Sequence, residues 1–393
     1  MSLCLSGEQG SEDGAAMKVL IVATGIAPRM GGVGQYERQV LPHLAASLTA
    51  RGCHVTVLLC RDGSLSHLDA GVRVVRLPVS RNPGILRILA ENLYIPGLSF
   101  RADVAVALDH RLPLVPIRAG RTLVVVHDAI LLHQMAGELP TDGDTLRRWH
   151  YSLIMTRAIK AADILVANSE YTASQIARFF PVAERISVVP LGVDHERFHP
   201  PCGDGEIERL RRFHGLPAQF YLFVGSLSFH KNLRLIVDTY SSGDLPQQYM
   251  LPVVLAGVSR NDDPSNPTLQ LIDRKGIGKY FQFLGYVQNS DLPALYATAR
   301  ALIQPACEEG FGLPPLEAMA CGTPVIVSNR TSLPEVVGDA ALMIDPGSLE
   351  SLAKALQSVN DEAMRKQLIE RGLKRAATYS WQRTAEMTAE QIL

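Results

Sequence analysis

The sequence predicts two α/β domains, each with a doubly wound parallel sheet. Three observations predict this fold class. With 393 residues the chain is long for one hydrophobic core, because a domain usually holds roughly 100 to 200 residues. From Lys18 onward, short β-branched runs alternate with longer stretches of helical spacing. The alternation stops near Pro200, in a segment rich in proline and glycine, and then starts again.

The composition is that of an ordinary globular protein. Hydrophobic residues make up 47% of the chain and charged residues 20%, which supplies packed cores and argues against disorder. The formal net charge of -1 argues against a protein that neutralises a nucleic-acid backbone, so we expect no nucleic-acid partner. A mild basic surplus between Met17 and Pro200 fits an anionic substrate, but it is more often a solvated surface.

The cysteines and the start of the chain indicate a cytoplasmic location. The six cysteines contain no CxxC pair and are best explained as buried, reduced thiols. No apolar run approaches the ~18 residues of a membrane span, and the first residues do not resemble a signal peptide. Because "MKVLIVAT" starts at Met17 like a first strand, residues 1–16 are expected to form a disordered extension.

The first domain is expected over residues 17–200. It opens as strand, corner, helix and strand, with the sequences "KVLIVAT", "GGVGQYERQVLPHLAASLTARG" and "HVTVLL". Helices are expected from Thr145 to Ala162 and from Tyr171 to Phe180. Because the strands are apolar along their length, the sheet should be parallel and covered on both faces. The further strands are "VRVVRLP", "ADVAVAL", "TLVVVHD", "ADILVANS" and "RISVVPLG".

The second domain is expected over residues 201–378 and repeats this alternation. A helix is expected from Ser290 to Ala299, and the segments from Leu349 to Val359 and from Asp361 to Thr378 are helical. The last segment, 379–393, is a helix that is a candidate to cross back to the first domain. The strands are "FYLFVGS", "LPVVLAG", "YFQFLGY", "RALIQPA" and "TPVIVSN".

The stretch "EEGFGLPPLEAMACG" places two carboxylates around a glycine-rich corner between two of these strands. Glu309 precedes the corner, and Glu317 lies on the following helix, which should run from about Pro314 to Ala320. Carboxylates bind phosphate poorly, but they readily accept hydrogen bonds from the paired hydroxyls of a sugar. The pair therefore predicts one carboxylate for each of two sugars. Outside such a setting, glutamates at this spacing are usually a helix cap and a solvated residue.

A phosphate can bind between the two carboxylates, where glycines allow backbone N–H groups to approach and the helix dipole favours an anion. The candidate contacts are Gly310, Phe311, Gly312 and Leu313.

The second half resembles family 4 of the retaining glycosyltransferases, which have the GT-B fold of two Rossmann-like domains facing a cleft. The signature of this family is a glutamate pair followed by two further runs. Here it stands as Glu309 to Glu317, Ala320 to Val325 ("ACGTPV") and Pro334 to Ala340 ("PEVVGDA"). The resemblance implies that Glu309 contacts the transferred hexose of a donor and Glu317 the ribose.

A second candidate site lies in "FVGSLSFHKN". Gly225 ends a strand, and Lys231 opens the next helix, where its ammonium can reach a diphosphate and neutralise the leaving group. The family usually carries an arginine where this chain has His230, which is charged only near or below pH ~6.5. Outside the family context Lys231 would be an ordinary surface lysine.

The first domain contributes two further candidates. Gly31, Gly32 and Gly34 resemble the N-terminal glycine loop of the family and would face the cleft. His127 lies at the end of a predicted strand, where open α/β sheets bind their ligands, and the resemblance places it near the reacting sugar. A histidine at such a place is otherwise usually a core or turn residue.

Other strand-to-helix corners are weaker candidates. Asp128 follows His127, and "NSEY" contains Ser169, which we expect to cap a helix.

The resemblance implies a retaining transfer of a hexose, with mannose as first choice, to a polysaccharide or a lipid-linked glycan. GDP-mannose is favoured over a UDP-sugar as donor. No cofactor and no metal are expected, since no metal-ligand cluster can be singled out and GT-B enzymes use helix dipoles and cationic side chains instead. Domain closure would bring the donor on the second domain against the acceptor on the first.

Two other classes stay open: a non-catalytic GT-B protein that binds a nucleotide sugar, and a GT-B sugar-nucleotide epimerase or phosphorylase. Peripheral membrane contact at the inner face is also open. The segment "RNPGILRILAENLYIPGL" combines apolar residues with Arg81 and Arg87, which fits an interfacial patch or an ordinary core helix.

Overall fold

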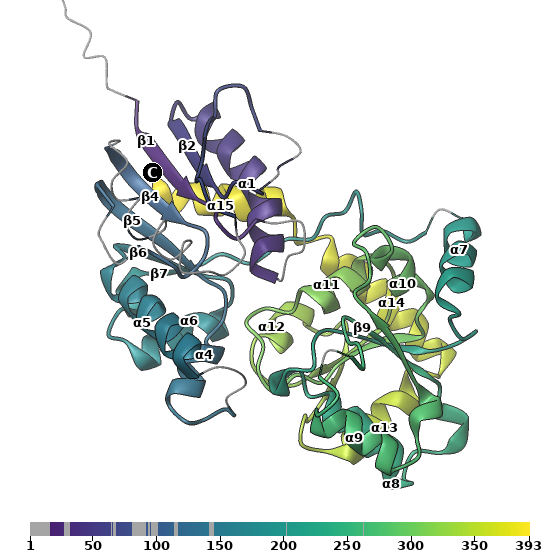
Figure 1. The fold of residues 1–393 in the computed structure, drawn as a ribbon. Coiled ribbons are helices and arrows are strands. Elements are labelled where there is room, and N and C mark those ends of the chain that lie inside the picture. Colours follow the sequence, from purple (N-terminus) through teal and green to yellow (C-terminus); the bar gives the residue numbers. More distant parts are fainter. Residues whose placement is uncertain are drawn as a thin grey trace, which may run out of the picture.

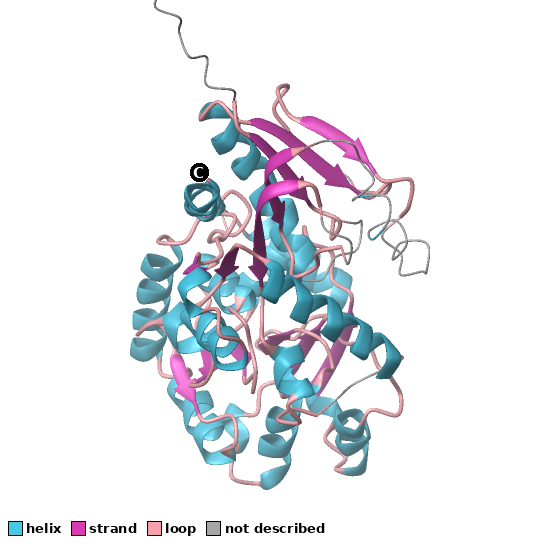
Figure 2. Cartoon of the chain, turned by 90° about the vertical axis from the view of Figure 1, so that its left-hand side faces the viewer, coloured by secondary structure: helices cyan, strands magenta, loops and turns pink. Residues whose placement is uncertain are grey.

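The protein is described by a computed structural model. It describes residues 16–393 apart from 27–31, 64, 66–67, 81–91, 93–94, 96–100, 114–116, 141–144, 202 and 262. The chain forms two lobes, each built around one parallel sheet (Figure 1). Helices lie on both sides of the sheets (Figure 2). The predicted fold class is therefore confirmed.

The first sheet has seven parallel strands in the order β3-β2-β1-β4-β5-β6-β7. The central strands β1 and β4 are buried along nearly their whole length and β5 over its second half, which is why they read as apolar runs. The strands are β1 Lys18–Val22, β2 His54–Leu59, β3 Arg73–Arg76, β4 Ala102–Ala107, β5 Ala119–Val126, β6 Ile164–Ala167 and β7 Ile186–Val188. Its helices include α1 Gly32–Ala50, α4 Ile130–Met135, α5 Thr145–Ala161 and α6 Glu170–Phe179.

The second sheet has six parallel strands in the order β10-β9-β8-β11-β12-β13. The strands are β8 Tyr221–Val224, β9 Val253–Ala256, β10 Phe281–Gly285, β11 Ala301–Gln304, β12 Val325–Ser328 and β13 Leu342–Ile344. The helices are α7 Asp204–His214, α8 Leu233–Ser242, α9 Pro267–Arg274, α10 Leu292–Thr298, α11 Leu313–Ala320, α12 Leu333–Val337, α13 Leu349–Ser358 and α14 Glu362–Ala376. The sequence analysis misses β13, because this edge strand has only three residues and is half exposed.

In both sheets the strand order reverses beside the first strand of the domain. The first sheet reverses between β1 and β4, and the second between β8 and β11. Such a reversal opens a crevice at the carboxyl ends of the strands, where doubly wound proteins bind ligands. The fold therefore offers one crevice in each lobe.

The last helix, α15 (Trp381–Ile392), lies beside α1 of the first lobe (Figure 1). The ring of Trp381 packs edge-on against Tyr36, with 5.9 Å between centroids. Arg121 Nη2 at the start of β5 donates a hydrogen bond of 2.8 Å to the carbonyl of Ile392. The chain thus crosses between the lobes twice, once after β7 and once before α15.

The two crossings touch at Gly192. A Cβ atom at this position would lie 2.2 Å from the backbone nitrogen of Trp381, so only glycine fits. One apolar core passes through this point, because buried residues of both lobes belong to it. The crossings therefore form a packed hinge rather than two independent linkers.

Candidate active site

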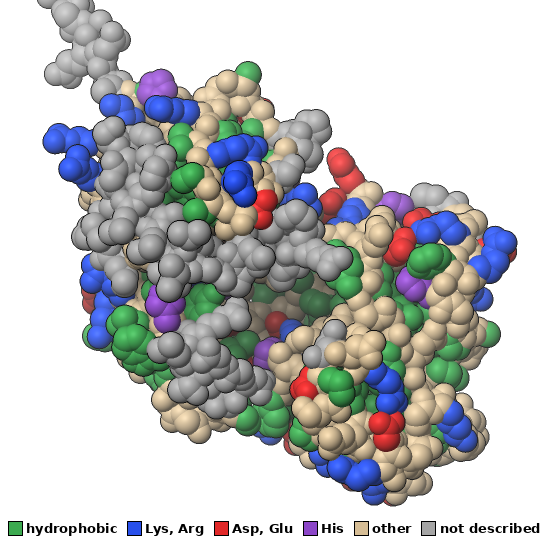
Figure 3. Space-filling view, viewed as in Figure 1, with side chains coloured by type: hydrophobic (Ala, Val, Ile, Leu, Met, Phe, Trp, Pro, Cys, Tyr) green, Lys and Arg blue, Asp and Glu red, His purple; other side chains and the backbone are tan. Residues whose placement is uncertain are grey.

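A cavity of about 580 Å³ lies between the two lobes. It appears in Figure 3 as a hollow with charged side chains on its floor. The segments that line it follow the carboxyl ends of strands β1, β5, β6, β7, β8, β9, β10 and β11. Both crevices therefore open into one space, as expected for a site that joins two ligands.

Glu309 and Lys231 form an ion pair in this cavity. Lys231 Nζ lies 2.6 Å from Glu309 Oε2, and both side chains are mostly buried. The same carboxylate oxygen accepts a hydrogen bond of 3.1 Å from Gln304 Nε2 at the end of β11. The structure therefore joins two residues that the sequence places 78 positions apart.

The position of Lys231 depends on Asn232, which the sequence analysis misses. Lys231 ends a short 3-10 turn, and α8 begins at Leu233, so the lysine precedes the helix instead of opening it. Asn232 has a left-handed backbone, with φ of 54°. Its side-chain amide donates hydrogen bonds of 3.0 Å to the carbonyls of Pro305 and Pro346, which fixes the turn.

The start of α12 holds the glycine corner before α11. Gly312 has φ of 109°, and a Cβ there would lie 2.6 Å from a methyl group of Leu333. Ser332 Oγ donates hydrogen bonds to the carbonyls of Glu309 (2.8 Å) and Phe311 (3.0 Å). These contacts fix the backbone that carries Glu309.

Gly310 faces the first lobe. A Cβ at this position would lie 2.0 Å from the carbonyl oxygen of His127, so the corner and the end of β5 can approach only if residue 310 is glycine. Gly310, Phe311, Gly312 and Leu313 all line the cavity. The helix α11 starts at Leu313, one residue earlier than predicted.

Glu317 lies in a different environment. It is buried at the edge of the cavity, and its Oε2 accepts a hydrogen bond of 2.8 Å from the hydroxyl of Tyr296. Burial raises the pKa of Glu317 to about 7, although the Tyr296 hydrogen bond and the charge of Arg197 oppose this shift. Near neutral pH this carboxyl therefore exists in both protonation states.

His127 lies at the end of β5 and lines the cavity. Its Nε2 lies 2.8 Å from the carbonyl oxygen of Leu108, which can only accept, so Nε2 carries a proton. Nδ1 is then the ring atom that can accept a hydrogen bond. Burial lowers the pKa of His127, which favours this neutral form.

The remaining predicted residues lie at different distances from the cavity. Gly32 and Gly225 line it, whereas Gly34 is buried in the first turn of α1. His230 is not among the described residues that line the cavity, and its carbonyl accepts a hydrogen bond of 2.8 Å from the amide of Cys307. Gly31 and the predicted patch over residues 81–98 lie outside the described residues, apart from Asn92 and Ile95.

Several residues of the cavity wall are missed by the sequence analysis. Gly257 follows β9 with φ of 87°, and a Cβ there would lie 2.6 Å from the carbonyl oxygen of Gly225. The rule that ligands bind at strand ends would have identified these residues, since each lies at the end of a predicted strand or between that strand and the start of the next helix. They are Gly257 after β9 and Tyr286, Val287, Asn289 and Leu292 after β10.

Two family models match the chain. The model "Glycosyl transferases group 1" matches residues 206–375, and the model "Glycosyl transferase 4-like domain" matches residues 31–192. None of the helices in the described part of the chain has the length and apolar character of a membrane span.

Three relatives resemble the chain in sequence. The O-antigen chain mannosyltransferase B of Escherichia coli is 36% identical over 234 residues, which cover 59% of this chain and 60% of that protein. The serotype-specific mannosyltransferase WbdA of Escherichia coli is 30% identical over 333 residues, which cover 82% of this chain and 39% of that protein. The D-inositol 3-phosphate glycosyltransferase of Corynebacterium jeikeium (strain K411) is 30% identical over 270 residues, which cover 66% of this chain and 64% of that protein. The chain thus matches less than two thirds of the length of each relative.

Two solved structures share the fold. The sucrose-phosphate synthase from Thermosynechococcus elongatus superposes with a TM-score of 0.71 at 20% identity, over 95% of this chain and 98% of that one. WaaG, a glycosyltransferase involved in lipopolysaccharide biosynthesis, superposes with a TM-score of 0.67 at 19% identity and the same coverage.

Proposed function

The chain belongs to the group 1 glycosyltransferases and has their GT-B fold, and we propose from this that it transfers a hexose from a nucleotide diphosphate sugar to a glycan. One observation carries the proposal. The Glu309–Lys231 pair and Glu317 face a single cavity, at the crevice where doubly wound sheets bind nucleotides.

The donor would lie along the second lobe. Glu317 accepts the hydroxyls of the ribose, Lys231 binds the diphosphate, and Glu309 accepts hydroxyls of the hexose. A bound diphosphate competes with Glu309 for Lys231, so the ion pair opens as the donor enters. The freed carboxylate then takes the sugar hydroxyls, which couples recognition of the two donor parts.

Transfer breaks the bond between the sugar C1 and the diphosphate oxygen and forms a bond from C1 to an acceptor hydroxyl. Lys231 stabilises the negative charge that develops on the leaving diphosphate, as preorganised cations do in such sites. In our proposal the configuration at C1 is retained, and the acceptor proton passes to the leaving diphosphate on the same face. His127, through Nδ1, accepts a hydrogen bond from the hexose.

We further propose that the sugar is mannose, supplied as GDP-mannose. Both Escherichia coli relatives are named mannosyltransferases, and one is named for the O-antigen chain. The acceptor is then a polysaccharide or a lipid-linked glycan, which would place the enzyme in the cytoplasm or at the inner face of the membrane. No divalent metal is required in this proposal, because Lys231 supplies the charge at the leaving group.

The test is a transfer assay with GDP-mannose, UDP-glucose and UDP-galactose against a lipid-linked glycan acceptor, run with and without EDTA. We expect release of GDP and an α-linked product from GDP-mannose, unchanged by EDTA. Turnover of a UDP-sugar alone would move the proposal to another hexose. Donor binding without turnover would favour the non-catalytic alternative, and conversion of the free donor to an epimer would favour the epimerase.

A further inference from the structure

The first turn of α6 holds the corner that carries Glu309. Ser169 Oγ donates a hydrogen bond of 2.7 Å to the carbonyl of Gly310, and Thr172 Oγ1 reaches the same oxygen at 3.2 Å. Ser169 also caps α6 by accepting the Thr172 amide, as predicted from sequence. The helix start of one lobe is therefore docked on the corner of the other.

Carboxylates of the second lobe complete this docking. The Glu335 carboxylate accepts hydrogen bonds from the backbone amides of Glu170 (2.9 Å) and Tyr171 (3.0 Å). A residue of the second lobe therefore caps the N-terminus of α6 in the first lobe. The hydroxyl of Tyr171 donates a hydrogen bond of 2.8 Å to Glu308 Oε2. Glu308 directly precedes Glu309, so this bond acts on the corner itself.

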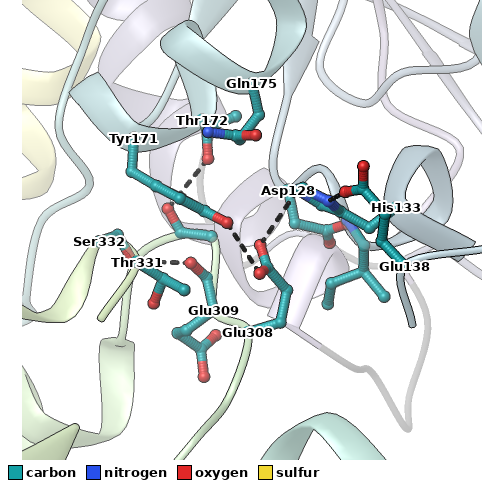
Figure 4. A network of polar contacts seen from close by, with 12 residues as sticks. Asp128, His133, Glu138, Tyr171, Thr172, Gln175, Glu308, Glu309, Thr331 and Ser332 are labelled. Carbon is teal, nitrogen blue, oxygen red and sulfur yellow. Dashed lines mark hydrogen bonds and ion pairs between the residues drawn. The ribbon is translucent and has the colours of Figure 1, made fainter. Parts of the chain in front are cut away.

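The other oxygen of Glu308 faces a histidine (Figure 4). Glu308 Oε1 lies 3.9 Å from His133 Nε2 of α4, which is too long for a hydrogen bond. Both atoms are buried, and neither has a hydrogen-bond partner in the described part of the chain. A further approach of about 1 Å would make this contact a hydrogen bond.

A hydrogen bond between Glu308 Oε1 and His133 Nε2 requires a proton on one of these two atoms. His133 Nδ1 lies 2.7 Å from the Glu138 carboxylate. This carboxylate also accepts hydrogen bonds from both Nη atoms of Arg178. Since Arg178 and His133 lower the pKa of Glu138, this carboxylate accepts and Nδ1 carries the proton. In a neutral His133, Nε2 then has a lone pair that faces another lone pair on Glu308. One added proton turns this repulsion into a hydrogen bond.

We propose that Glu308 and His133 share one proton across the two lobes and thereby position Glu309 for transfer. Glu308 is a positioning residue in this account, because it acts through the backbone of its neighbour. The proposal rests on the proposed function only where it concerns transfer.

The charges around the pair agree with a bound proton. Burial raises the pKa of Glu308, and the nearby carboxylates of Asp128 and Glu309 raise it further, whereas Tyr171 and His133 lower it. The charged or titratable groups that face the pair are Asp128, Glu138, Tyr171, Arg178 and Glu309.

A matched set of substitutions tests the shared proton. In Glu308→Gln, the amide oxygen accepts a hydrogen bond from Tyr171, and the amide nitrogen donates one to His133. The contact between residues 308 and 133 is then a hydrogen bond that does not depend on a titrating proton. Glu308→Ala removes both hydrogen bonds. Ser174→Ala is the control, because this exposed residue of α6 makes its hydrogen bond to its own helix, at the carbonyl of Tyr171.

The first readout needs no activity. A carboxyl whose pKa is raised by folding stabilises the protein while it is protonated, and this stability is lost as pH rises. Melting temperatures of wild type and Glu308→Gln, measured without ligand between about pH 5 and pH 9, should therefore diverge with rising pH in favour of the variant. A difference that stays constant over this range overturns the proposal.

The second readout concerns positioning. We expect Glu308→Ala to lower kcat by roughly tenfold or more with an unchanged donor KM, because the donor lies on the second lobe and only the approach of the lobes is impaired. Glu308→Gln should restore kcat and remove its fall at high pH. Wild-type kcat in Glu308→Ala contradicts the positioning role.

If the wild type transfers no sugar, the proposed function fails. The melting comparison still tests whether Glu308 and His133 share a proton. The positioning role is then decided by hydrogen exchange of the amides of residues 308–312, which should be faster in Glu308→Ala and unchanged in Glu308→Gln. Equal exchange in all three proteins would refute it.

Discussion

Glu309 and Glu317 belong to one motif and line one cavity, but their surroundings differ. Glu309 lies in the turn before α11, where the ammonium of Lys231 and the amide of Gln304 hold it. Glu317 lies on the helix itself, where a neutral hydroxyl, that of Tyr296, is its hydrogen-bond partner. Burial raises the pKa of Glu317 to about 7, against the opposing charge of Arg197.

The spacing of the motif thus sets where the two carboxylates lie, whereas the fold sets what each can do. A carboxylate paired with a cation can exchange that cation for a substrate phosphate. A carboxyl held by a hydroxyl can bind a neutral diol and changes its charge near neutral pH. Glu309 is thus suited to the reacting end of a donor and Glu317 to the end that is only bound.

The largest expected effect is at the reacting end. Glu309→Gln should lower kcat by about a hundredfold, because a hexose that loses the carboxylate contact to its hydroxyls is no longer held in the reacting position. The melting temperature should change little, because glutamine can still accept from Lys231. Steady-state transfer kinetics check this, with the exposed Glu350→Gln as control. A kcat near that of the wild type would remove Glu309 from the reaction.

The next largest effect is expected where the glycine corner before α11 approaches the first lobe. The methyl group of Gly310→Ala would lie 2.0 Å from the carbonyl oxygen of His127, so the corner must move away. We expect kcat to fall about a hundredfold, because a displacement of about 1 Å is enough to do this. Gly205→Ala, with no neighbour within 4 Å, is the matched control. Equal activity of both variants would show that the contact is dispensable.

A smaller effect is expected at the binding end. Glu317→Gln should raise the donor KM by roughly tenfold and leave kcat within a few-fold, since it weakens a contact that is the same before and during transfer. Initial rates over a range of donor concentrations separate the two constants. A loss in kcat with an unchanged KM would place Glu317 at the reacting end after all.

The smallest effect is on stability. The pKa of Glu317 is raised from 4.5 to about 7, so the protein loses stability as pH rises through this interval, on the order of 3 kcal/mol. Glu317→Gln removes this loss and should melt higher than the wild type at about pH 8, but not at about pH 4.5. Thermal melts in the two buffers check this. The same difference in both buffers would mean that Glu317 does not titrate.

The sequence predicts those parts of this account that depend on local pattern. Continuous apolar strands indicate parallel sheets, and glycines and carboxylates after a strand indicate a ligand site. Contacts between distant segments have no such signal. The pairing of Lys231 with Glu309 follows from the strand order, because the two residues come after the neighbouring strands β8 and β11. The approach of Gly310 to His127 follows from how the two sheets face each other.

For some side chains the sequence predicts no role, although two of them, Glu308 and Tyr171, lie in stretches that it singles out. Glu308, His133 and Tyr171 lie in three separate segments, and each is of a type that is common on protein surfaces. Their role becomes visible only in the structure, where they are in contact at the junction of the lobes. Asn232 is similar, because a left-handed asparagine is recognised only once its two carbonyl partners are known.

The most direct test of the two roles is calorimetric titration of GDP and GDP-mannose into the wild type, Glu309→Gln and Glu317→Gln. We predict that Glu317→Gln weakens both ligands to the same extent, because both contain the ribose. Glu309→Gln should weaken GDP-mannose and leave GDP as tight as before or tighter, since a neutral glutamine competes with the diphosphate for Lys231 less than the carboxylate does. If Glu309→Gln weakens GDP as much as GDP-mannose, or Glu317→Gln affects only the sugar nucleotide, the assignment of one glutamate to each sugar is wrong.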